Sequence, residues 1–364
     1  MKNLKIFKNA RVVVTGHTGF KGSWLTAWLK ELDSKVMGIS LNPNTSPSHF
    51  RVSSIGKNIK DIRIDVREKK KLEKKIINFK PNFIFHLAAQ AIVGDSYKDP
   101  SLTWETNVFG TLNILESARK LKNNCIIVII TSDKCYLNRE IHYGYKETDT
   151  LGGKDPYSGS KASAEILIQS HINSFFKNNN KIRIATARAG NVIGGGDWAK
   201  NRIVPDCVRS WSKNKKAILR NPKSTRPWQH VLEAVGGYLC LAVNLSKNKK
   251  IHGESFNFGP NLTREYSVLK LVKTMSKYWK DVSWSSNKKQ KKFFESELLR
   301  LNCNKAKKLL QWNSILNFEE LMAMVTEWYK NYYTNKKNSS SMTLKQIQNY
   351  QKLAIRRGLN WAKK

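Results

Sequence analysis

Short apolar runs rich in β-branched side chains recur along the first half of the chain, each about as long as one strand. Their hydrophobic positions are continuous rather than alternating, which is typical of parallel strands covered on both faces. The runs predict strands at Arg11 to Thr15, Lys35 to Ser40, Asn82 to Ala88, Cys125 to Thr131 and Arg183 to Arg188.

Segments with one apolar face separate these runs and predict helices at Gly22 to Leu32, Asn107 to Leu121 and Tyr157 to Phe176. Strands that alternate with helices build a mostly parallel sheet with helices on both faces. We therefore predict an α/β fold whose main part, residues 1–190, is a Rossmann-type doubly wound parallel sheet.

The pattern becomes irregular after about Asn191, where glycines and prolines punctuate short elements. Residues 191–334 are expected to form a smaller C-terminal α/β lobe that binds substrate, and parts of it could return to the main sheet. The stretch Asn335 to Ser341 is polar throughout and predicts a linker. Leu344 to Ala362 predicts a terminal helix, so residues 335–364 are interpreted as a linker with a helical extension.

The charge of the chain is strongly positive, with 65 Lys and Arg against 27 Asp and Glu, or formally +38. Such an excess is typical of proteins that bind nucleic acids. Here the lysines are scattered in runs such as Lys69 to Lys71, and no DNA- or RNA-binding module accompanies them. A solvated basic surface is the simpler interpretation, and we expect no nucleic-acid partner.

The five cysteines, Cys125, Cys135, Cys207, Cys240 and Cys303, show no C-x-x-C spacing, which indicates neither a disulfide framework nor a zinc site. The apolar runs are too short for a signal peptide or a membrane span. We therefore expect a soluble cytoplasmic protein that binds no metal and no membrane.

Between Thr15 and Gly22 the chain reads TGHTGFKG, with Gly16, Gly19 and Gly22 in G-x-x-G-x-x-G spacing after a predicted strand. Glycines let backbone amides approach a pyrophosphate, and the N-terminus of the following helix favours negative charge. The spacing predicts a dinucleotide site, with an ordinary tight turn as the alternative. His17 is expected either beside the phosphates or facing solvent.

The end of the second predicted strand does not specify which dinucleotide binds. A carboxylate there would bind the ribose hydroxyls of NAD, but the chain has Ser40 and Leu41, and no arginine immediately replaces it. Asp65 and Val66 follow the next short apolar stretch and could flank the adenine. An ordinary loop aspartate is the alternative for Asp65.

Tyr157 and Lys161 stand four residues apart and share one face of a predicted helix. A tyrosine is a poor base at neutral pH, but an adjacent ammonium and a cationic nicotinamide favour its phenolate. Ser132 follows a predicted strand, where its hydroxyl could bind the reacting oxygen. Together with the glycine loop, these residues indicate proton abstraction coupled to hydride transfer.

Eight segments of the chain match one protein family. They are TGHTGFKG (15–22), HLAAQ (86–90), TNVFGT (106–111), TSDKCY (131–136), DPYSGSK (155–161), RAGNVIGGGDWA (188–199), RIVPD (202–206) and RPWQHVLE (226–233). On these residues the chain resembles the extended short-chain dehydrogenase/reductases, from Arg11 to about Trp328. TSDKCY and RAGNVIGGGDWA are the most specific segments, and they resemble those members that remove water from a nucleotide sugar.

The resemblance implies CDP-glucose as substrate and NAD as a cofactor that is regenerated in each turnover. Tyr157 would take the proton of the 4-hydroxyl while carbon 4 gives hydride to NAD. The ketone then acidifies the proton at carbon 5, water leaves from carbon 6, and hydride returns there to form CDP-4-keto-6-deoxy-D-glucose. The implied cofactor-binding residues are Gly16, His17, Gly19, Phe20, Gly22, Asp65, Val66, Ala88, Ala89, Gln90, Tyr157 and Lys161.

Related dehydratases read Thr-Asp-Glu where this chain reads Ser132-Asp133-Lys134. Asp133 keeps the position of the acid that assists water loss, and capping of a turn is its structural alternative. Lys134 takes the position of the carbon-5 base; it could act as a base only when neutral, or it could stabilise an enolate or hold phosphate. The implied catalytic residues are Ser132, Asp133, Lys134, Tyr157 and Lys161.

The anionic end of the substrate requires donors. Arg226 is the first candidate, because a guanidinium can bind a diphosphate through two parallel bonds. Asn191, Arg202 and Trp198 are further candidates for substrate binding. Each could instead pack within the lobe, and for Trp198 packing is an equal alternative.

Two positions depart from the family pattern. Gly94 stands where an arginine is expected, which puts a substrate contact in doubt, and Gly159 replaces an asparagine in the tyrosine motif. The resemblance also places a dimer interface at the helices that contain Asn107 and Tyr157, so a homodimer or homotetramer is expected. A dehydratase or epimerase acting on another nucleotide sugar, or a non-catalytic dinucleotide sensor, are the alternative functions.

Overall fold

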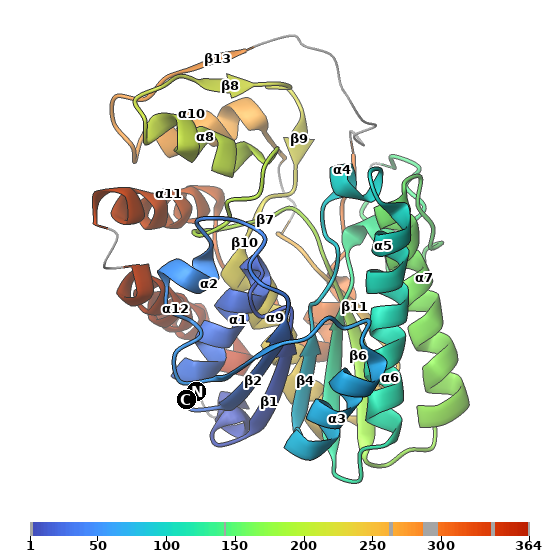
Figure 1. The fold of residues 1–364 in the computed structure, drawn as a ribbon. Coiled ribbons are helices and arrows are strands. Elements are labelled where there is room, and N and C mark those ends of the chain that lie inside the picture. The colour runs from blue at the N-terminus through green and yellow to red at the C-terminus, as the bar shows by residue number, and fades with distance from the viewer. Residues whose placement is uncertain (1–2, 142, 262–264, 287–297, 336–338, 363–364) are drawn as a thin grey trace.

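A seven-stranded parallel sheet forms the centre of the computed structural model (Figure 1). The structure describes residues 3–141, 143–261, 265–286, 298–335 and 339–362. Across the sheet the strand order is β11-β6-β5-β4-β1-β2-β3, so chain order reverses between β1 and β4. Doubly wound sheets bind their ligands at the carboxyl ends of the strands at such a reversal. The predicted Rossmann-type α/β fold is confirmed.

The strands of the main sheet lie close to their predicted positions. Their bounds are β1 Arg11–Thr15, β2 Lys35–Ser40, β3 Lys60–Arg63, β4 Phe83–His86, β5 Cys125–Ile130, β6 Ile182–Ala189 and β11 Ser255–Phe258. The apolar pattern does not predict the two edge strands. β3 is mostly exposed and β11 has only four residues, so neither leaves a long hydrophobic run.

Helices cover both faces of the sheet (Figure 1). On one face lie α1 (Phe20–Glu31) and α9 (Val231–Lys247), and on the other lie α3 (Lys69–Phe79), α6 (Gly110–Arg119) and α7 (Pro156–His171). Each face has its own hydrophobic core, and α1 buries Trp24 and Trp28 completely in one of them. Burial on both sides explains why the strand sequences are apolar without alternation.

The predicted helices at 107–121 and 157–176 are each part of a longer helical region. α5 (Pro100–Trp104) and a π-helical turn at Glu105–Phe109 precede α6, and a second π-helical turn at Ile172–Phe176 follows α7. The shorter helix α2 (His49–Val52) lies between β2 and β3 in the chain, and α4 (Val93–Ser96) lies between β4 and α5.

The lobe lies beyond the carboxyl ends of the strands (Figure 1). It contains α8 (Ile203–Trp211), α10 (Val268–Ser276), α11 (Phe318–Thr334) and three strand pairs. The pairs are β7 (Val192–Ile193) with β10 (Gln229–His230), β8 (Ala217–Leu219) with β13 (Trp284–Ser286), and β9 (Thr225–Arg226) with β12 (Tyr266–Ser267). α9 and β11 return from this region to the main sheet, so its segments alternate with parts of the sheet.

α12 (Ser339–Arg356) packs against α1 and α11. The Thr343 hydroxyl lies 3.0 Å from His49 Nε2 and 3.1 Å from Trp328 Nε1, and the Tyr350 hydroxyl donates to Glu233 at 2.7 Å. The prediction of a linker at 335–341 is wrong for Ser339 to Ser341, which begin α12. Residues 336–338 of that linker lie outside the described chain. Packing of this turn against buried neighbours overrides its polar composition.

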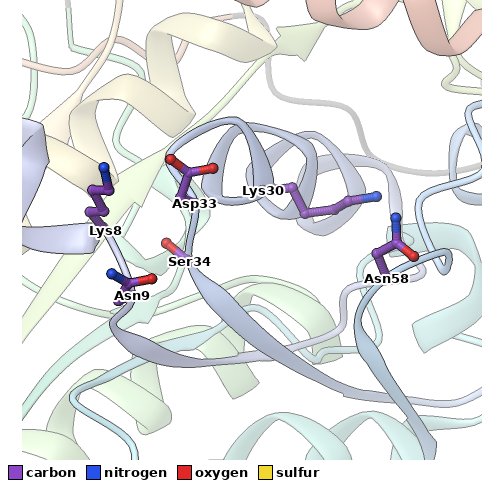
Figure 2. A pocket seen from close by; sticks show the side chains of 6 residues that line it. All are labelled: Lys8, Asn9, Lys30, Asp33, Ser34 and Asn58. Carbon is purple, nitrogen blue, oxygen red and sulfur yellow. The ribbon is translucent and has the colours of Figure 1, made fainter.

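A pocket of about 450 Å³ opens at the amino-terminal side of the sheet (Figure 2). It is lined by Lys8, Asn9, Lys30, Asp33, Ser34 and Asn58. These residues precede β1, β2 and β3, whereas the predicted catalytic residues follow carboxyl ends of strands. Because the strands are parallel, the pocket lies at their amino ends and the predicted site lies at their carboxyl ends.

Candidate active site

The glycine loop packs closely between the segment that follows β4 and the first turn of α1. Gly16 has a φ of +73°, and a Cβ placed on it would lie 2.7 Å from the Ala88 nitrogen. A Cβ on Gly22 would lie 2.1 Å from the Gly16 oxygen. Both positions therefore require glycine, the first for its left-handed backbone and both for close approach. Gly19 caps α1 without any side-chain hydrogen bond, which leaves the amides of the first turn available to an anion.

His17 is completely buried, so the interpretation of it as a solvent-facing loop residue is wrong. Its Nε2 lies 2.8 Å from Asp61 Oδ1, and a Cβ on Gly38 of β2 would collide with its ring. The edge of the ring meets Phe50 at 5.3 Å between centroids. Burial lowers its pKa despite the Asp61 carboxylate, so the imidazole fills the space beside β2 as a neutral group.

Most of the other predicted cofactor residues follow the carboxyl ends of β3 and β4, and Phe20 begins α1. The Thr18 and Ser40 hydroxyls are 2.8 Å apart, which ties the glycine loop to the end of β2. Asp65 accepts from the Arg67 guanidinium, with Oδ2 at 2.8 Å from Nη2, and Val66 is buried. The remaining positions, Phe20, Ala88, Ala89 and Gln90, are partly buried.

The predicted catalytic residues Ser132, Asp133 and Lys134 lie at a single 3-10 turn, Asp133–Cys135, shortly after the end of β5. We call Asp133–Cys135 the catalytic turn. Ser132 caps it: its Oγ accepts from the Lys134 nitrogen at 3.2 Å and donates to Asp133 Oδ1 at 2.9 Å. Asp133 is 5% exposed, and a Cβ on Gly190 would lie 1.8 Å from its Oδ2. The carboxyl group therefore packs against the end of β6 at a position where only glycine leaves room.

Tyr157 and Lys161 lie in the first turns of α7, which begins with Asp155 as cap and Pro156. Asp155 Oδ1 accepts from the Ser158 nitrogen at 2.9 Å, and this bond fixes the start of the helix. Lys161 reaches back to β5 and donates to the Ile130 oxygen at 3.3 Å. The two side chains therefore point from one helix face toward the end of β5.

The structure brings Ser132, Asp133 and Tyr157 into one site. Burial raises the pKa of Tyr157 to about 12, although a hydrogen bond with Ser132 favours the phenolate, and the Asp133 charge acts on the same phenol. Burial, together with the nearby charge of Lys21, lowers the pKa of Lys161 to about 8. Tyr157 thus holds its proton at neutral pH in the chain alone.

Lys21 is a site residue that the sequence reasoning missed. It lies in the first turn of α1, and its Nζ is 3.5 Å from the Tyr238 hydroxyl of α9. Burial lowers its pKa to about 8, Asp133 opposes this shift, and Arg202 adds to it. The available signal was a lysine inside the glycine motif, where its ammonium would face the end of β5.

Lys134 follows Asp133 and is partly buried. Its backbone nitrogen is bound to Ser132, and its ammonium group has no recorded hydrogen bond or ion pair with the described residues. No cluster of metal-binding side chains is found in the described part of the chain, and no helix there is long and apolar enough to cross a membrane.

The predicted substrate residues separate into two groups. Arg202 binds Asp197 at 2.8 Å, and the Asp197 carboxylate raises the pKa of the guanidinium. Tyr157 contributes to the same shift, so Arg202 lies close to Tyr157. Asn191, with a φ of +52°, lies between the end of β6 and β7. Trp198 is 4% exposed and lies among the aromatic rings of α11, with its Nε1 at 3.2 Å from the Tyr333 hydroxyl. The contacts of Trp198 are those of lobe packing.

Arg226 lies on the β9–β12 pair, opposite Tyr266. The neighbouring Glu265 binds the Thr225 hydroxyl at 2.9 Å and Arg300 Nε at 2.6 Å, and the charge of Arg226 acts on the same carboxylate. Two guanidinium groups therefore lie near Glu265 on this side of the lobe. Arg300 could not be found from sequence, because its place beside Arg226 depends on the fold.

Comparison with known proteins tests the family resemblance directly. The family model described as GDP-mannose 4,6 dehydratase matches residues 13–325. The chain belongs to this dehydratase family. The CDP-glucose 4,6-dehydratase of Salmonella typhimurium is 42% identical over 335 residues, which is 91% of this chain and 93% of that protein. The CDP-paratose 2-epimerase of Salmonella typhi is 28% identical and covers 74% of this chain and 84% of its own length.

Solved structures of dehydratases and epimerases share the fold of this dehydratase family member. The dTDP-glucose 4,6-dehydratase of Bacillus anthracis in complex with NAD superposes with a TM-score of 0.70 at 21% identity, covering 92% of this chain and 99% of that one. The UDP-glucuronic acid 4-epimerase of Bacillus cereus in complex with UDP-glucuronic acid and NAD has a TM-score of 0.75 at 22% identity, with 89% and 100% coverage. These structures share the fold of the chain. The family match and the 42% identical relative confirm the predicted family, and the chain is an enzyme of the hydro-lyase class.

Proposed function

We propose that this dehydratase converts CDP-D-glucose to CDP-4-keto-6-deoxy-D-glucose with NAD as its bound cofactor. The observation that carries the proposal is the placement of a buried carboxyl group, Asp133, beside Ser132 and Tyr157. Hydride transfer alone needs the phenol and hydroxyl, whereas loss of water also needs an acid. The 42% identical relative that is named CDP-glucose 4,6-dehydratase supports the choice of substrate.

The residues of the glycine loop fit a dinucleotide. The uncapped first turn of α1 and the close approach at Gly16 and Gly22 provide space and donors for a pyrophosphate. When bound, NAD would accept hydride from carbon 4 of the sugar and return it to carbon 6. The residues proposed to hold it are Gly16, His17, Gly19, Phe20, Gly22, Asp65, Val66, Ala88, Ala89, Gln90, Tyr157 and Lys161.

Tyr157 would accept the proton of the 4-hydroxyl. The Ser132 hydroxyl donates to Asp133 in this structure, and it would turn to donate to the same sugar oxygen when substrate is bound. The pKa of Tyr157 near 12 means that a further positive charge must be present for it to act near neutral pH. Lys161 is already present in the chain and is charged below its pKa of about 8, so the further charge would be that of a cationic nicotinamide. Deprotonation of Tyr157 is thereby coupled to cofactor binding.

Asp133 would give a proton to the departing 6-hydroxyl group. Its burial in the turn and against Gly190 keeps the carboxyl group in one direction, and Ser132 binds one of its oxygens. Lys134 would stabilise the enolate that forms after loss of the carbon-5 proton, since its ammonium group has no recorded partner in the described chain. For the diphosphate we propose Arg226, with Arg300 beside it, while Asn191, Arg202 and Trp198 stay candidates for the rest of the substrate.

The substrate is tested by incubating the enzyme with CDP-glucose and with its UDP, GDP and dTDP analogues, and by measuring the 4-keto chromophore that develops in alkali. We expect turnover of CDP-glucose, and about 10²- to 10⁴-fold less with Tyr157→Phe because the base is lost. Turnover of another analogue with CDP-glucose inert would transfer the proposal to that sugar. No turnover of any analogue with added NAD would overturn the proposed activity.

Assembly as a homodimer, or as a homotetramer built from such dimers, is also proposed. Large apolar side chains are exposed on α5 to α7 and their flanking π-helical turns: Phe109 is 56%, Ile166 is 59% and Phe175 is 46% exposed. Exposed apolar side chains on adjacent helices are typical of protein interfaces.

We also propose a cytoplasmic location. The five cysteines are all free thiols, which supports this location.

A further inference from the structure

A buried ion pair lies directly beneath the catalytic turn. Arg188 of β6 donates from Nε and Nη2 to the two carboxylate oxygens of Glu165 on α7, each at 2.9 Å. Arg188 is 3% exposed and Glu165 is 0% exposed. Burial alone would raise the pKa of Glu165, but the guanidinium reverses the shift and keeps the carboxylate charged. None of the steps proposed above uses this pair.

The remaining donors of Arg188 are all bound as well. Nη2 also donates to the Ser255 hydroxyl at 3.1 Å, and Nη1 donates to the Tyr136 hydroxyl at 2.8 Å and to the Glu147 oxygen at 3.3 Å. The Tyr136 hydroxyl in turn donates to Asn257 at 2.8 Å. A guanidinium with every donor occupied is held in one orientation and can hold its partners in theirs.

This network grips both ends of the catalytic turn. Thr131, which precedes Ser132, donates to one Glu165 oxygen, and Tyr136, which follows Cys135, accepts from Arg188. The intervening residues include the acid Asp133. Gly190, two residues beyond Arg188 and directly after β6, abuts the Asp133 carboxyl group, so the segment that carries Arg188 also limits where that group can lie.

We propose that the Arg188–Glu165 pair is a positioning device that aims Asp133 at the departing hydroxyl group, and that it serves water loss more than oxidation. The inference rests on the proposed dehydration. Tyr157 has supports of its own, the Asp155 cap of α7 and the Lys161 contact with β5, so it depends less on the turn. Loosening one end of the turn should therefore slow water loss while proton transfer at the 4-hydroxyl continues.

The test uses single hydroxyl deletions at matched positions. Thr131→Val removes the bond between the turn and Glu165, and Tyr136→Phe removes the bond between the other end and Arg188. Thr186→Val is the control: the Thr186 hydroxyl donates to Glu165 at 3.0 Å from the middle of β6 and is equally buried, but it does not hold the turn. Thr131→Ser restores a hydroxyl at the first position.

The measurement is a single turnover of CDP-glucose followed by absorbance of reduced nicotinamide, with the melting temperature of each variant. In Thr131→Val and Tyr136→Phe we expect reduced cofactor to accumulate, because water loss falls at least about tenfold while its formation changes by less than about threefold. The melting temperature of Thr186→Val should fall to a similar extent, but reduced cofactor should not accumulate in this variant. In Thr131→Ser, which keeps a hydroxyl group, reduced cofactor should accumulate no more than in the parent enzyme. Equal behaviour of Thr131→Val and Thr186→Val would overturn the proposal.

Hydrogen exchange separates this inference from the proposed activity. The Cys135 nitrogen donates to the Ser132 oxygen at 3.2 Å inside the turn. We expect this amide to exchange faster in Thr131→Val than in Thr186→Val, whatever the substrate. If the parent enzyme is inert toward CDP-glucose but the exchange differs in this way, the proposed activity is wrong, whereas the proposal that the Arg188–Glu165 pair holds the turn is supported. Unchanged exchange at the turn would overturn the positioning role even in an active enzyme.

Discussion

Two lysines and one carboxyl group dominate the electrostatics of the site. Burial lowers the pKa of Lys21 and of Lys161, the charge of Lys21 also lowers that of Lys161, and Asp133 favours the charged form of Lys21. The site is therefore short of negative charge. A substrate with a diphosphate and a reaction that passes through an enolate both place negative charge where this surplus can stabilise it.

Lys134 should matter more for elimination than for oxidation. We expect Lys134→Ala to slow release of water from the 4-keto intermediate about 10²-fold, because the Lys134 ammonium, which is bound by none of the described residues, would stabilise the enolate. Formation of reduced nicotinamide in the same single turnover should stay within about threefold. Lys146→Ala, an exposed lysine of the following loop, is the control, and release of water at the normal rate in Lys134→Ala would contradict the role.

Lys21 should oppose folding near neutral pH. Its pKa falls from 10.5 to about 8 through burial, so its contribution to stability is present above 10.5 and is lost as pH falls through 8. Since Lys21 keeps some exposure, we expect Lys21→Met to raise the free energy of unfolding by about 1–2 kcal/mol at pH 7. Urea denaturation should show this gain shrinking between pH 8 and 10, with no such trend in the exposed Lys70→Met.

The sequence specified the residues whose spacing is local. Tyr157 and Lys161 follow from one turn of helix, and Ser132 from the end of a strand. Lys21 was missed although it stands inside the glycine motif, whereas Gly190 and Arg300 could not be assigned, because their roles arise from contacts between segments far apart in the chain. Burial of His17 was likewise beyond local reasoning, since it depends on the space left by Gly38 and on Asp61 two strands away.

At the scale of elements, α12 is attached through a buried carboxyl group. Glu233 in the first turn of α9 accepts from the Ile315 and Leu316 nitrogens at 2.7 Å each and from the Tyr350 hydroxyl of α12 at 2.7 Å. Burial raises the pKa of Glu233 from 4.5 to about 7 against these donors. One side chain thus joins α9, the segment before α11, and α12.

Replacing this carboxylate by an amide should stabilise the chain in alkali. Because folding raises the pKa of Glu233, the folded state is more stable when this carboxyl group is protonated. This contribution to stability is fully present below pH 4.5 and is lost as pH rises through 7. Glu233→Gln can still accept from both backbone amides, so we expect about 1–2 kcal/mol more stability at pH 8 and almost no gain at pH 5. Urea denaturation at both pH values checks this, with the exposed Glu327→Gln as control; an equal gain at both would contradict it.

Elements with continuous apolar runs were predictable and those without them were not. The five predicted strands coincide with β1, β2, β4, β5 and β6, because burial on both faces leaves an unbroken signal. The edge strands β3 and β11 have no such apolar run, and they are strands because they pair with β2 and β6. The start of α12 was hidden in the same way, since its serines become helical by packing against neighbours distant in sequence.

At the scale of the whole molecule, the helical face of α5 to α7 should control assembly. Ile166→Lys places a charge at an exposed apolar position of α7, and the chain already carries a formal +38, so we expect the affinity of the proposed dimer to fall at least about tenfold. Sedimentation velocity across a concentration series measures this. Ile218→Lys, at an equally exposed isoleucine of the lobe, should leave the distribution unchanged, and equal effects of both would contradict the interface.

The late arrival of β11 has a consequence for synthesis of the chain. β6 is the outermost strand until Ser255–Phe258 pairs with it, and that segment leaves the ribosome only after α8 and α9 have been made. During this interval an apolar strand presents free amides and carbonyls to other nascent chains. Yield in a heterologous host should therefore depend on chaperone supply and low growth temperature, even for variants whose finished fold is as stable as the parent.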